Sequence, residues 1–243
     1  MKQFFTLGIL ALFLFSCSSE TKQKEVIIHP ISHGSLVIEY GEDIIYIDPV
    51  GKVEDFKGIN KPTIILITDI HGDHLNLETL EVLSDSTIFI VIPNAVNERL
   101  NNNIKGERII LNNTDSKIVN GINIEAIPMY NLREEALKFH EKGRGNGYVI
   151  TLGKERIYIS GDTEDIPEMR ALENIDKAFV CMNLPWTMTV ENAANAVLEF
   201  KPKEVYPYHY RGTDGFSDIE KFKTLVNSEN KNINVNLIDW YKQ

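Results

Sequence analysis

Two aspartates and two histidines stand close together in the sequence DIHGDH at residues 69–74. The preceding residues 63–67 (TIILI) form a continuous apolar run, which is typical of a strand buried on both faces. Carboxylate and neutral imidazole groups bind zinc, manganese and iron in proteins. Such a dense group predicts a metal site rather than a loop whose polar side chains only hydrogen-bond to one another. The predicted ligands are Asp69, His71, Asp73 and His74.

The loop resembles the HxHxDH signature of the metallo-β-lactamase superfamily, and further motifs of that family follow it in the same order. The segment SGDT at 160–163 is similar to the family's GDT segment, whose aspartate bridges two metal ions. The segment YPYHY at 206–210 is similar to the one that carries the family's last histidine ligand. The resemblance covers about residues 26 to 240, and it implies that Asp162 and His209 also bind metal.

Within this superfamily the pattern is most similar to the UlaG-like branch. The motifs with counterparts there are SHGS at 32–35, DP at 48–49, GDT at 161–163 and PYHY at 207–210. The resemblance implies a four-layer αββα sandwich, an α/β fold that some schemes class as α+β. The branch includes a sugar-phosphate lactonase and phospholipid-cleaving phosphodiesterases, which makes an ester, lactone or phosphodiester bond the implied target.

The sequence departs from the family at two places in one half of the metal site. Asp69 stands where the family has its first histidine, and this exchange favours harder ions such as Mn²⁺. The family's mid-chain histidine is also missing, since residues 128–131 read PMYN. Three residues could contact metal or substrate instead, namely Tyr130, Asn131 and His140. For His140, metal ligand, substrate contact and ordinary loop residue all remain open.

The other half of the site is intact and implies a mechanism with one or two divalent ions, Zn, Mn or Fe. Asp73 is expected to bind metal and also to orient the attacking water and move its proton. We expect His33 and Asp48 to hydrogen-bond to ligands rather than to bind metal. Further side chains that could line the pocket are Trp186, Met188 and Tyr210.

Strand patterns outnumber helix patterns, and the helices are interspersed among the strands. Helices are expected at 77–83, 95–100, 166–172, 190–200 and 219–227. Strands are expected at 26–28, 35–40, 43–47, 63–67, 87–92, 108–111, 116–119, 122–127, 148–152, 156–159, 204–207 and 235–238, with a strand-like run at 178–182. This order favours two packed sheets with helices outside them.

The 243 residues are 43% hydrophobic and carry a formal charge of −10. We read residues 26–243 as a single domain, and nucleic acid is not an expected partner because its binding needs an excess of basic residues. Two cysteines are too few for a disulfide-stapled scaffold or a multi-cysteine zinc cluster. Cys181 lies in an apolar run and is expected to be buried and inert.

The N-terminal residues indicate export. Residues 1–16 combine a lysine with an apolar run that is short for a membrane span, as in a secretory signal peptide. The segment LFSC at 14–17 resembles a bacterial lipobox, in which Cys17 would be lipidated; an ordinary signal peptide is the alternative. Residues 17–25 would then be a polar tether. This predicts a lipoprotein of the bacterial cell envelope, on the periplasmic side, that contacts the membrane only through its lipid anchor.

These features together predict a metal-dependent hydrolase that acts on a small-molecule or lipid substrate. The alternative is a non-catalytic protein, a ligand-binding or envelope-maintenance lipoprotein on a degenerate hydrolase scaffold. The loss of two expected histidine ligands favours the alternative, whereas the presence of Asp73 and Asp162 favours the enzyme.

Overall fold

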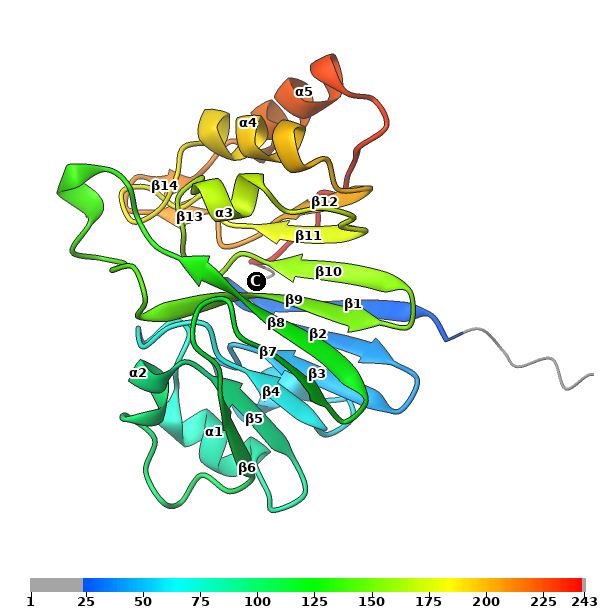
Figure 1. The fold of residues 1–243 in the computed structure, drawn as a ribbon, viewed down its shortest axis with the longest axis vertical. Coiled ribbons are helices and arrows are strands. Elements are labelled where there is room, and N and C mark those ends of the chain that lie inside the picture. Colours follow the sequence, from blue (N-terminus) through cyan, green and yellow to red (C-terminus); the bar gives the residue numbers. More distant parts are fainter. Residues whose placement is uncertain (1–23, 242–243) are drawn as a thin grey trace, which may run out of the picture.

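The computed structural model describes residues 24–241, in which two large β-sheets pack face to face with helices on their outer sides (Figure 1). The proposed signal peptide, Cys17 and most of the proposed tether lie outside the described residues. No helix within residues 24–241 combines the length and the apolar character that crossing a bilayer requires. The four-layer α/β arrangement predicted from the sequence is confirmed.

The first sheet has six strands in chain order, β1 to β6. Its first three strands pair antiparallel, and β3 to β6 pair parallel with α1 and α2 in the connections. The elements are β1 (Val26–Ser32), β2 (Ser35–Tyr40), β3 (Asp43–Ile47), η1 (Val53–Phe56), β4 (Ile64–Leu66), α1 (Leu77–Leu83), β5 (Phe89–Ile92), α2 (Asn94–Asn97) and β6 (Glu107–Ile110).

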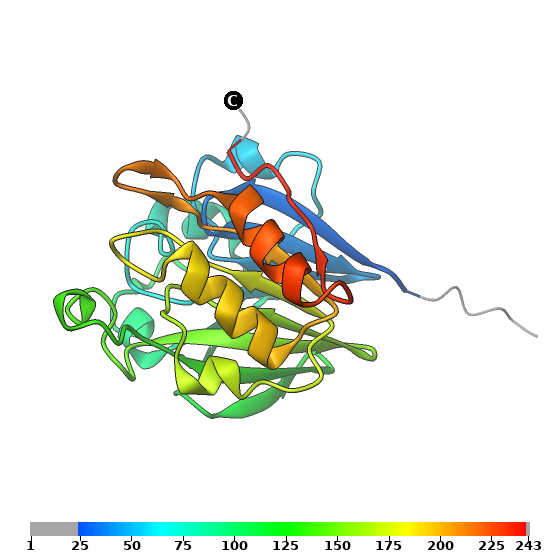
Figure 2. The same cartoon turned by 90° about the horizontal axis from the view of Figure 1, so that it is seen from above.

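The second sheet has seven strands in the order β15-β12-β11-β10-β9-β8-β7. Strands β7 to β10 pair antiparallel, whereas β10, β11, β12 and β15 pair parallel. Helices α4 and α5 lie side by side over this sheet (Figure 2). The elements are β7 (Ser116–Val119), β8 (Ile122–Met129), η2 (Glu134–Ala136), β9 (Gly145–Leu152), β10 (Glu155–Ile159), α3 (Pro167–Arg170), β11 (Lys177–Val180), α4 (Val190–Phe200), β12 (Glu204–Pro207), the hairpin strands β13 (Arg211–Gly212) and β14 (Gly215–Phe216), α5 (Ile219–Glu229) and β15 (Asn234–Val235).

Alternate residues of the inner strands belong to two different hydrophobic cores. Ile45 and Ile47 of β3 belong to the larger cluster of buried side chains, which the second sheet shares, whereas Ile44 and Tyr46 belong to the cluster beneath α1 and α2. Successive strand residues point to opposite faces, so a strand buried on both faces needs apolar side chains at every position. The continuous apolar runs in the sequence follow from this requirement.

Most predicted elements match the observed ones, with differences at short elements. The helices predicted at 95–100 and 166–172 are single turns at Asn94–Asn97 and Pro167–Arg170. The hairpin of β13 and β14 was not predicted, because two-residue strands are too short to show an alternating pattern. Cys181 is buried as predicted, and burial raises the pKa of its thiol to about 12.

Candidate metal centre

The predicted site residues follow the carboxyl ends of strands in both sheets. The DIHGDH loop follows β4, Asp162 follows β10, and His209 follows β12. The carboxyl ends of strands are where loops form ligand sites in sheets of this kind. Residues from distant parts of the sequence therefore meet at one end of the sandwich.

The acidic and imidazole side chains form two groups. Group A contains Asp73, His74, Asp162 and His209, and group B contains Asp69, His71 and His140. Within each group, one donor atom of every residue lies within 4.8 Å of the donor atoms of the others. The DIHGDH loop thus divides its ligands between two groups, with Asp73 and His74 in group A and Asp69 and His71 in group B.

In group A, two imidazole nitrogens converge on one carboxylate. The Nε2 atoms of His74 and His209 are 3.2 Å apart, and each lies 3.4 Å from an oxygen of Asp162. Asp73 also contacts this pair, with Oδ2 3.4 Å from His209 Nε2. Four donor atoms thus surround one small volume.

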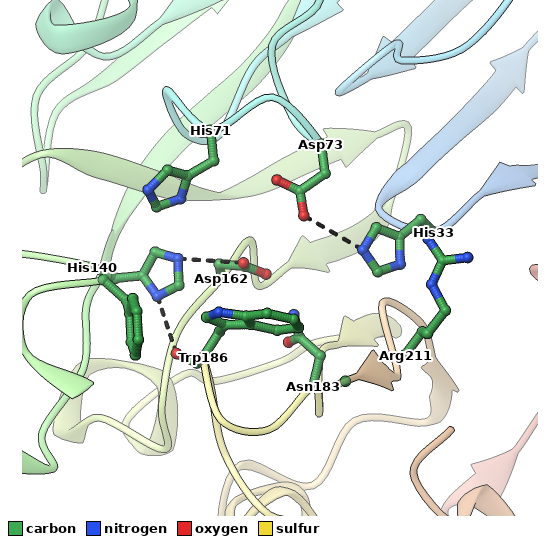
Figure 3. Close-up of a pocket in the computed structure, with 10 residues that line it drawn as sticks. His33, His71, Asp73, His140, Asp162, Asn183, Trp186 and Arg211 are labelled. Atoms are coloured by element: carbon green, nitrogen blue, oxygen red, sulfur yellow. Dashed lines mark hydrogen bonds and ion pairs between the residues drawn. The ribbon is translucent and has the colours of Figure 1, made fainter. Parts of the chain in front are cut away.

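In group B, His140 lies beside the two ligands Asp69 and His71 of the DIHGDH loop. Its Nε2 lies 3.9 Å from Asp69 Oδ2 and 3.3 Å from Asp162 Oδ2. His71 Nδ1 is 2.7 Å from Asp69 Oδ2. Asp162 therefore lies between the groups, and Figure 3 shows it between His140 on one side and Asp73 and His33 on the other.

Hydrogen bonds at the far ring nitrogens orient two of the histidines. His74 Nδ1 donates to Asp48 Oδ2 at 2.7 Å, and His140 Nδ1 donates to the carbonyl of Trp186 at 3.2 Å. With a proton on Nδ1, the neutral ring presents the lone pair of Nε2 toward the centre of its group. Metal-binding histidines in proteins are commonly held in this way.

The electrostatics of group A suit a bound cation. Burial raises the pKa of Asp162, but His209 and His74 outweigh burial and hold that pKa well below its usual range. Burial lowers the pKa of His74, but Asp162 and Asp48 raise it well above its usual range. Asp162 Oδ1 is buried without a hydrogen-bond donor within the described part of the chain, which is costly for a charged oxygen. The residues therefore fit a divalent cation.

Asp69 has a partner that the sequence did not suggest. Arg144 donates to both of its oxygens, from Nε to Oδ1 at 3.1 Å and from Nη2 to Oδ2 at 2.9 Å. The carboxylate is fully buried, so this ion pair offsets part of its desolvation. An arginine in the glycine-rich stretch GRGNG is the only sequence signal that could have pointed to it.

Tyr130 and Asn131 lie outside both groups. The Tyr130 hydroxyl donates to Glu168 Oε2 at 2.9 Å. The Asn131 amide nitrogen donates to the carbonyls of Ala136 and Trp186 at 2.9 and 2.6 Å. Asn131 thereby fixes the loop that carries His140, and neither residue lines the pocket of the metal groups.

Three site residues hold backbone conformations that side chains seldom adopt. His33, Asp48 and His209 have φ values of 53°, 43° and 46°. Backbone hydrogen bonds hold two of them, because His209 N donates to His33 O at 3.2 Å and Asp48 N to Leu66 O at 2.9 Å. Such strain is common at functional sites.

His33 contacts group A without joining either metal group. Its Nε2 lies 3.4 Å from Asp73 Oδ2, and its Nδ1 lies 2.7 Å from the hydroxyl of Tyr241. Gly34, the next residue, lies beneath the rings of two group A histidines: a Cβ there would be 2.8 Å from Cδ2 of His209 and 3.5 Å from Cε1 of His74.

A cavity of about 320 Å³ opens beside both groups. Its walls include Trp186, as the sequence suggested, together with Phe139, Asn183 and Arg211, which the sequence analysis did not single out. Met188 and Tyr210 are buried, and neither lines this cavity.

Known proteins share both the sequence and the fold. Residues 45–210 match the model of the Beta-lactamase superfamily domain. A UPF0173 metal-dependent hydrolase of Pyrococcus abyssi is 30% identical over 214 residues, which are 83% of this chain and 92% of that protein. A crystal structure of a candidate metal-dependent hydrolase from Parabacteroides distasonis is 40% identical, with a TM-score of 0.79 over 88% of this chain and 93% of that one.

A more distant structure supports the fold alone. Igni18, a metallo hydrolase of the archaeon Ignicoccus hospitalis, is 22% identical, with a TM-score of 0.74 over 88% of this chain and 95% of that one. The family match, the relatives and the two facing groups of donors agree with one another. This chain belongs to the metallo-β-lactamase superfamily, among its metal-dependent hydrolases.

Proposed function

We propose that this protein hydrolyses an ester, lactone or phosphodiester bond, with divalent cations held by groups A and B. The observation that carries this proposal is the place of Asp162, whose carboxylate lies within 3.4 Å of imidazole nitrogens from His74, His209 and His140. A carboxylate shared in this way suits two neighbouring cations. When bound, such cations polarise the substrate and make water acidic enough to act as a nucleophile near neutral pH.

Asp73 is the residue best suited to handle the attacking water. Its side chain is 43% exposed and lines the cavity, whereas that of Asp162 is 4% exposed. Burial raises the pKa of Asp73, but His209 and His33 together hold it well below its usual range. The carboxylate therefore stays ionised, so it can orient the attacking water by accepting a hydrogen bond from it.

The candidate ions are zinc, manganese and iron. Group A offers two imidazoles and two carboxylates, a set that suits zinc and also iron or manganese. Group B offers a carboxylate in place of one imidazole, which favours harder ions such as Mn²⁺.

The substrate is proposed to be a small molecule or a lipid. The motifs that resemble the UlaG-like branch support a lactone or a phosphodiester bond. The cavity of about 320 Å³ leaves room for a small molecule or for one end of a larger one.

The non-catalytic alternative rested on two missing histidine ligands. His140 places an imidazole beside Asp69 and His71. Only one of the two missing histidines therefore still favours the non-catalytic alternative. The remaining exchange, at Asp69, leaves a group that can still bind metal.

The proposed hydrolysis can be tested with p-nitrophenyl acetate, a small lactone and bis(p-nitrophenyl) phosphate, each with Zn²⁺, Mn²⁺ or Fe²⁺. We expect turnover of at least one compound and a fall in kcat of about 10²- to 10⁴-fold for Asp73→Asn at saturating metal, the usual size of a lost general base. Asp85→Asn, on a partly exposed aspartate that belongs to neither metal group and does not line the cavity, is the control that should keep full activity. No turnover in any combination, or no bound metal after reconstitution, would contradict the proposal.

We also propose that the protein is an envelope lipoprotein anchored through Cys17, on the basis of the lipobox-like sequence. Expression of the whole chain in a bacterial host with labelled palmitate tests this directly. We expect the label on the wild type and on Cys181→Ser, but not on Cys17→Ser. An unlabelled wild type would reject the lipid anchor.

A further inference from the structure

One wall of the cavity carries hydrogen-bond donors and no carboxylate. Asn183, Trp186 and Arg211 form this wall, which we call the donor wall. Figure 3 shows Arg211 on the side of His33, with Trp186 lying across the lower part of the pocket between Arg211 and His140. His71 of group B and Asp73 of group A lie on the opposite side of the pocket (Figure 3).

Arg211 carries a positive charge that no described carboxylate neutralises. Arg144, the other arginine beside the metal groups, is held by both oxygens of Asp69. The Arg211 guanidinium has no acceptor within residues 24–241; it lies 5.2 Å from the centre of the Tyr241 ring. The Arg211 backbone N–H donates to the Tyr241 hydroxyl at 3.1 Å. Tyr241 therefore contacts both the backbone and the guanidinium of Arg211.

Asn183 offers a second donor to the same space. Its side-chain oxygen accepts a hydrogen bond from Thr187 Oγ1 at 2.6 Å, which fixes the orientation of the amide. The residue is only 1% exposed, yet it lines the cavity. Its amide nitrogen, for which residues 24–241 provide no acceptor, is therefore the end that a bound molecule can use.

The donor wall is held in place before any substrate binds. Thr213 N donates to the Leu184 carbonyl at 3.2 Å, and Gly212 packs so closely that a Cβ there would lie 2.0 Å from the same oxygen. Arg133 Nη2 donates to the Pro185 carbonyl at 2.7 Å. The hairpin of Arg211 and the loop of Asn183 and Trp186 are thus joined, so binding need not order them.

We propose that the donor wall binds an oxyanion of the substrate, a carboxylate or a phosphate that is not itself cleaved, and that the Trp186 ring covers the adjoining part of the molecule. A guanidinium fits the two oxygens of such a group, and an amide N–H adds a further donor. This inference rests on the proposed hydrolase function and narrows its substrates to small anionic compounds.

A pair of matched esters tests the inference by kinetics. p-Nitrophenyl acetate and p-nitrophenyl hydrogen succinate share the bond that breaks and the leaving group, but only the second carries a distant carboxylate. For Arg211→Gln we expect KM for the succinate ester to rise about 10- to 100-fold, as for a lost charged hydrogen bond, with little change for the acetate ester. Arg211→Lys should restore part of the loss, because it keeps the charge.

Arg108→Gln is the matched control, since Arg108 lies on β6 at the outer edge of the first sheet. It should leave both KM values unchanged. Equal effects of Arg211→Gln on the two esters, or no effect on either, would overturn the inference.

A binding measurement separates this inference from the hydrolase proposal. Inorganic phosphate is titrated into zinc-loaded protein by calorimetry, and thermal melts check that each variant is folded. We expect binding by the wild type and a loss of about 10- to 100-fold in affinity for Arg211→Gln. Phosphate binding that depends on Arg211, in a protein that turns over none of the esters, the lactone or the phosphodiester with any of the three metals, would reject the hydrolase and keep the oxyanion site. A wild type that binds no phosphate, or a variant that binds it equally well, would reject the oxyanion site.

Discussion

Asp69 is the predicted ligand whose carboxylate is also paired with an arginine, Arg144. Its oxygens already accept hydrogen bonds from Arg144 at 2.9 and 3.1 Å and lie near His71 and His140. A cation in group B must compete with the guanidinium for the same lone pairs, whereas Asp162 Oδ1 has no donor within the described residues. The two groups should therefore differ in affinity.

We predict that group A fills before group B as zinc is added to metal-free protein. His74→Ala should lose the tighter binding step, and His140→Ala should lose only the weaker one. Calorimetric titration against zinc, with metal content measured by mass spectrometry, distinguishes the steps. Loss of the tighter step in His140→Ala would show that the order is reversed.

His74 also predicts how the metal-free protein responds to pH. Because Asp162 and Asp48 raise its pKa in the folded chain, the bound proton stabilises the fold below the unfolded pKa of about 6.5. This stabilisation is lost as the pH rises through the raised folded value. We expect the Tm of chelator-treated protein to fall as the pH rises above about 6.5, and the slope to be smaller in His74→Gln.

Zinc-loaded protein supplies the comparison for this pH effect. A bound cation keeps the His74 ring neutral, so the same rise in pH should leave its Tm nearly unchanged. An identical slope in the wild type and in His74→Gln, both without metal, would assign the effect to another group. The carboxylate of Asp162 affects stability only at acidic pH. Its lowered pKa stabilises the fold at higher pH, and this stability is lost as the pH falls through acidic values.

At the scale of elements, the turn between β1 and β2 packs directly under the rings of His74 and His209. Gly34 has room for no side chain, since a Cβ would lie 2.8 Å from Cδ2 of His209. His209 cannot retreat freely, because its backbone N–H donates to His33 O at 3.2 Å. The short turn therefore sets the position of a ligand from the other sheet.

We predict that Gly34→Ala weakens zinc binding about 10-fold or more while the chain still folds, because it displaces a ligand and leaves the cores intact. Gly72→Ala is the matched control: it lies within the DIHGDH loop, but a Cβ there meets nothing within 4 Å. Zinc affinity by competition with a chelator and circular dichroism measure the two properties. Equal zinc affinities for the two variants would show that His209 can shift away from the added Cβ without weakening zinc binding.

Regular elements were predictable where the pattern was long. The apolar runs of β3 and β4 and the helix of α4 follow from local residue order, since burial demands a fixed spacing. The hairpin of β13 and β14 is positioned by Leu184 and Tyr241, which are distant in sequence, so local pattern could not reveal it.

For the whole molecule, the candidate metal centre draws its residues from both sheets. The loop after β4 in the first sheet supplies Asp73 and His74, and the loops after β10 and β12 in the second supply Asp162 and His209. A cation bound by all four residues would connect the sheets at one end. Binding that occurs only in the folded state raises stability in proportion to its free energy.

We predict that a chelator lowers the Tm of the zinc-loaded protein by several degrees, because tight binding adds about 3 to 4 kcal/mol of stability. In His74→Ala the chelator should shift the Tm little, because group A is incomplete. Differential scanning calorimetry measures both. A large chelator shift that persists in the variant would place the stabilising metal elsewhere.

The sequence by itself determined the chemical types of the donors and their order along the chain, because each motif is local and follows a strand whose own pattern is local. Only the tertiary structure decided how the donors combine. It divided the DIHGDH loop between two groups, brought His140 to Asp69 and His71, and turned Asn131 toward backbone carbonyls. It also placed Arg144 on Asp69 and Arg211 at the cavity. The physical reason is that metal sites and pockets consist of contacts across large separations, such as the 135 residues between His74 and His209, and the packing of the two sheets sets those contacts.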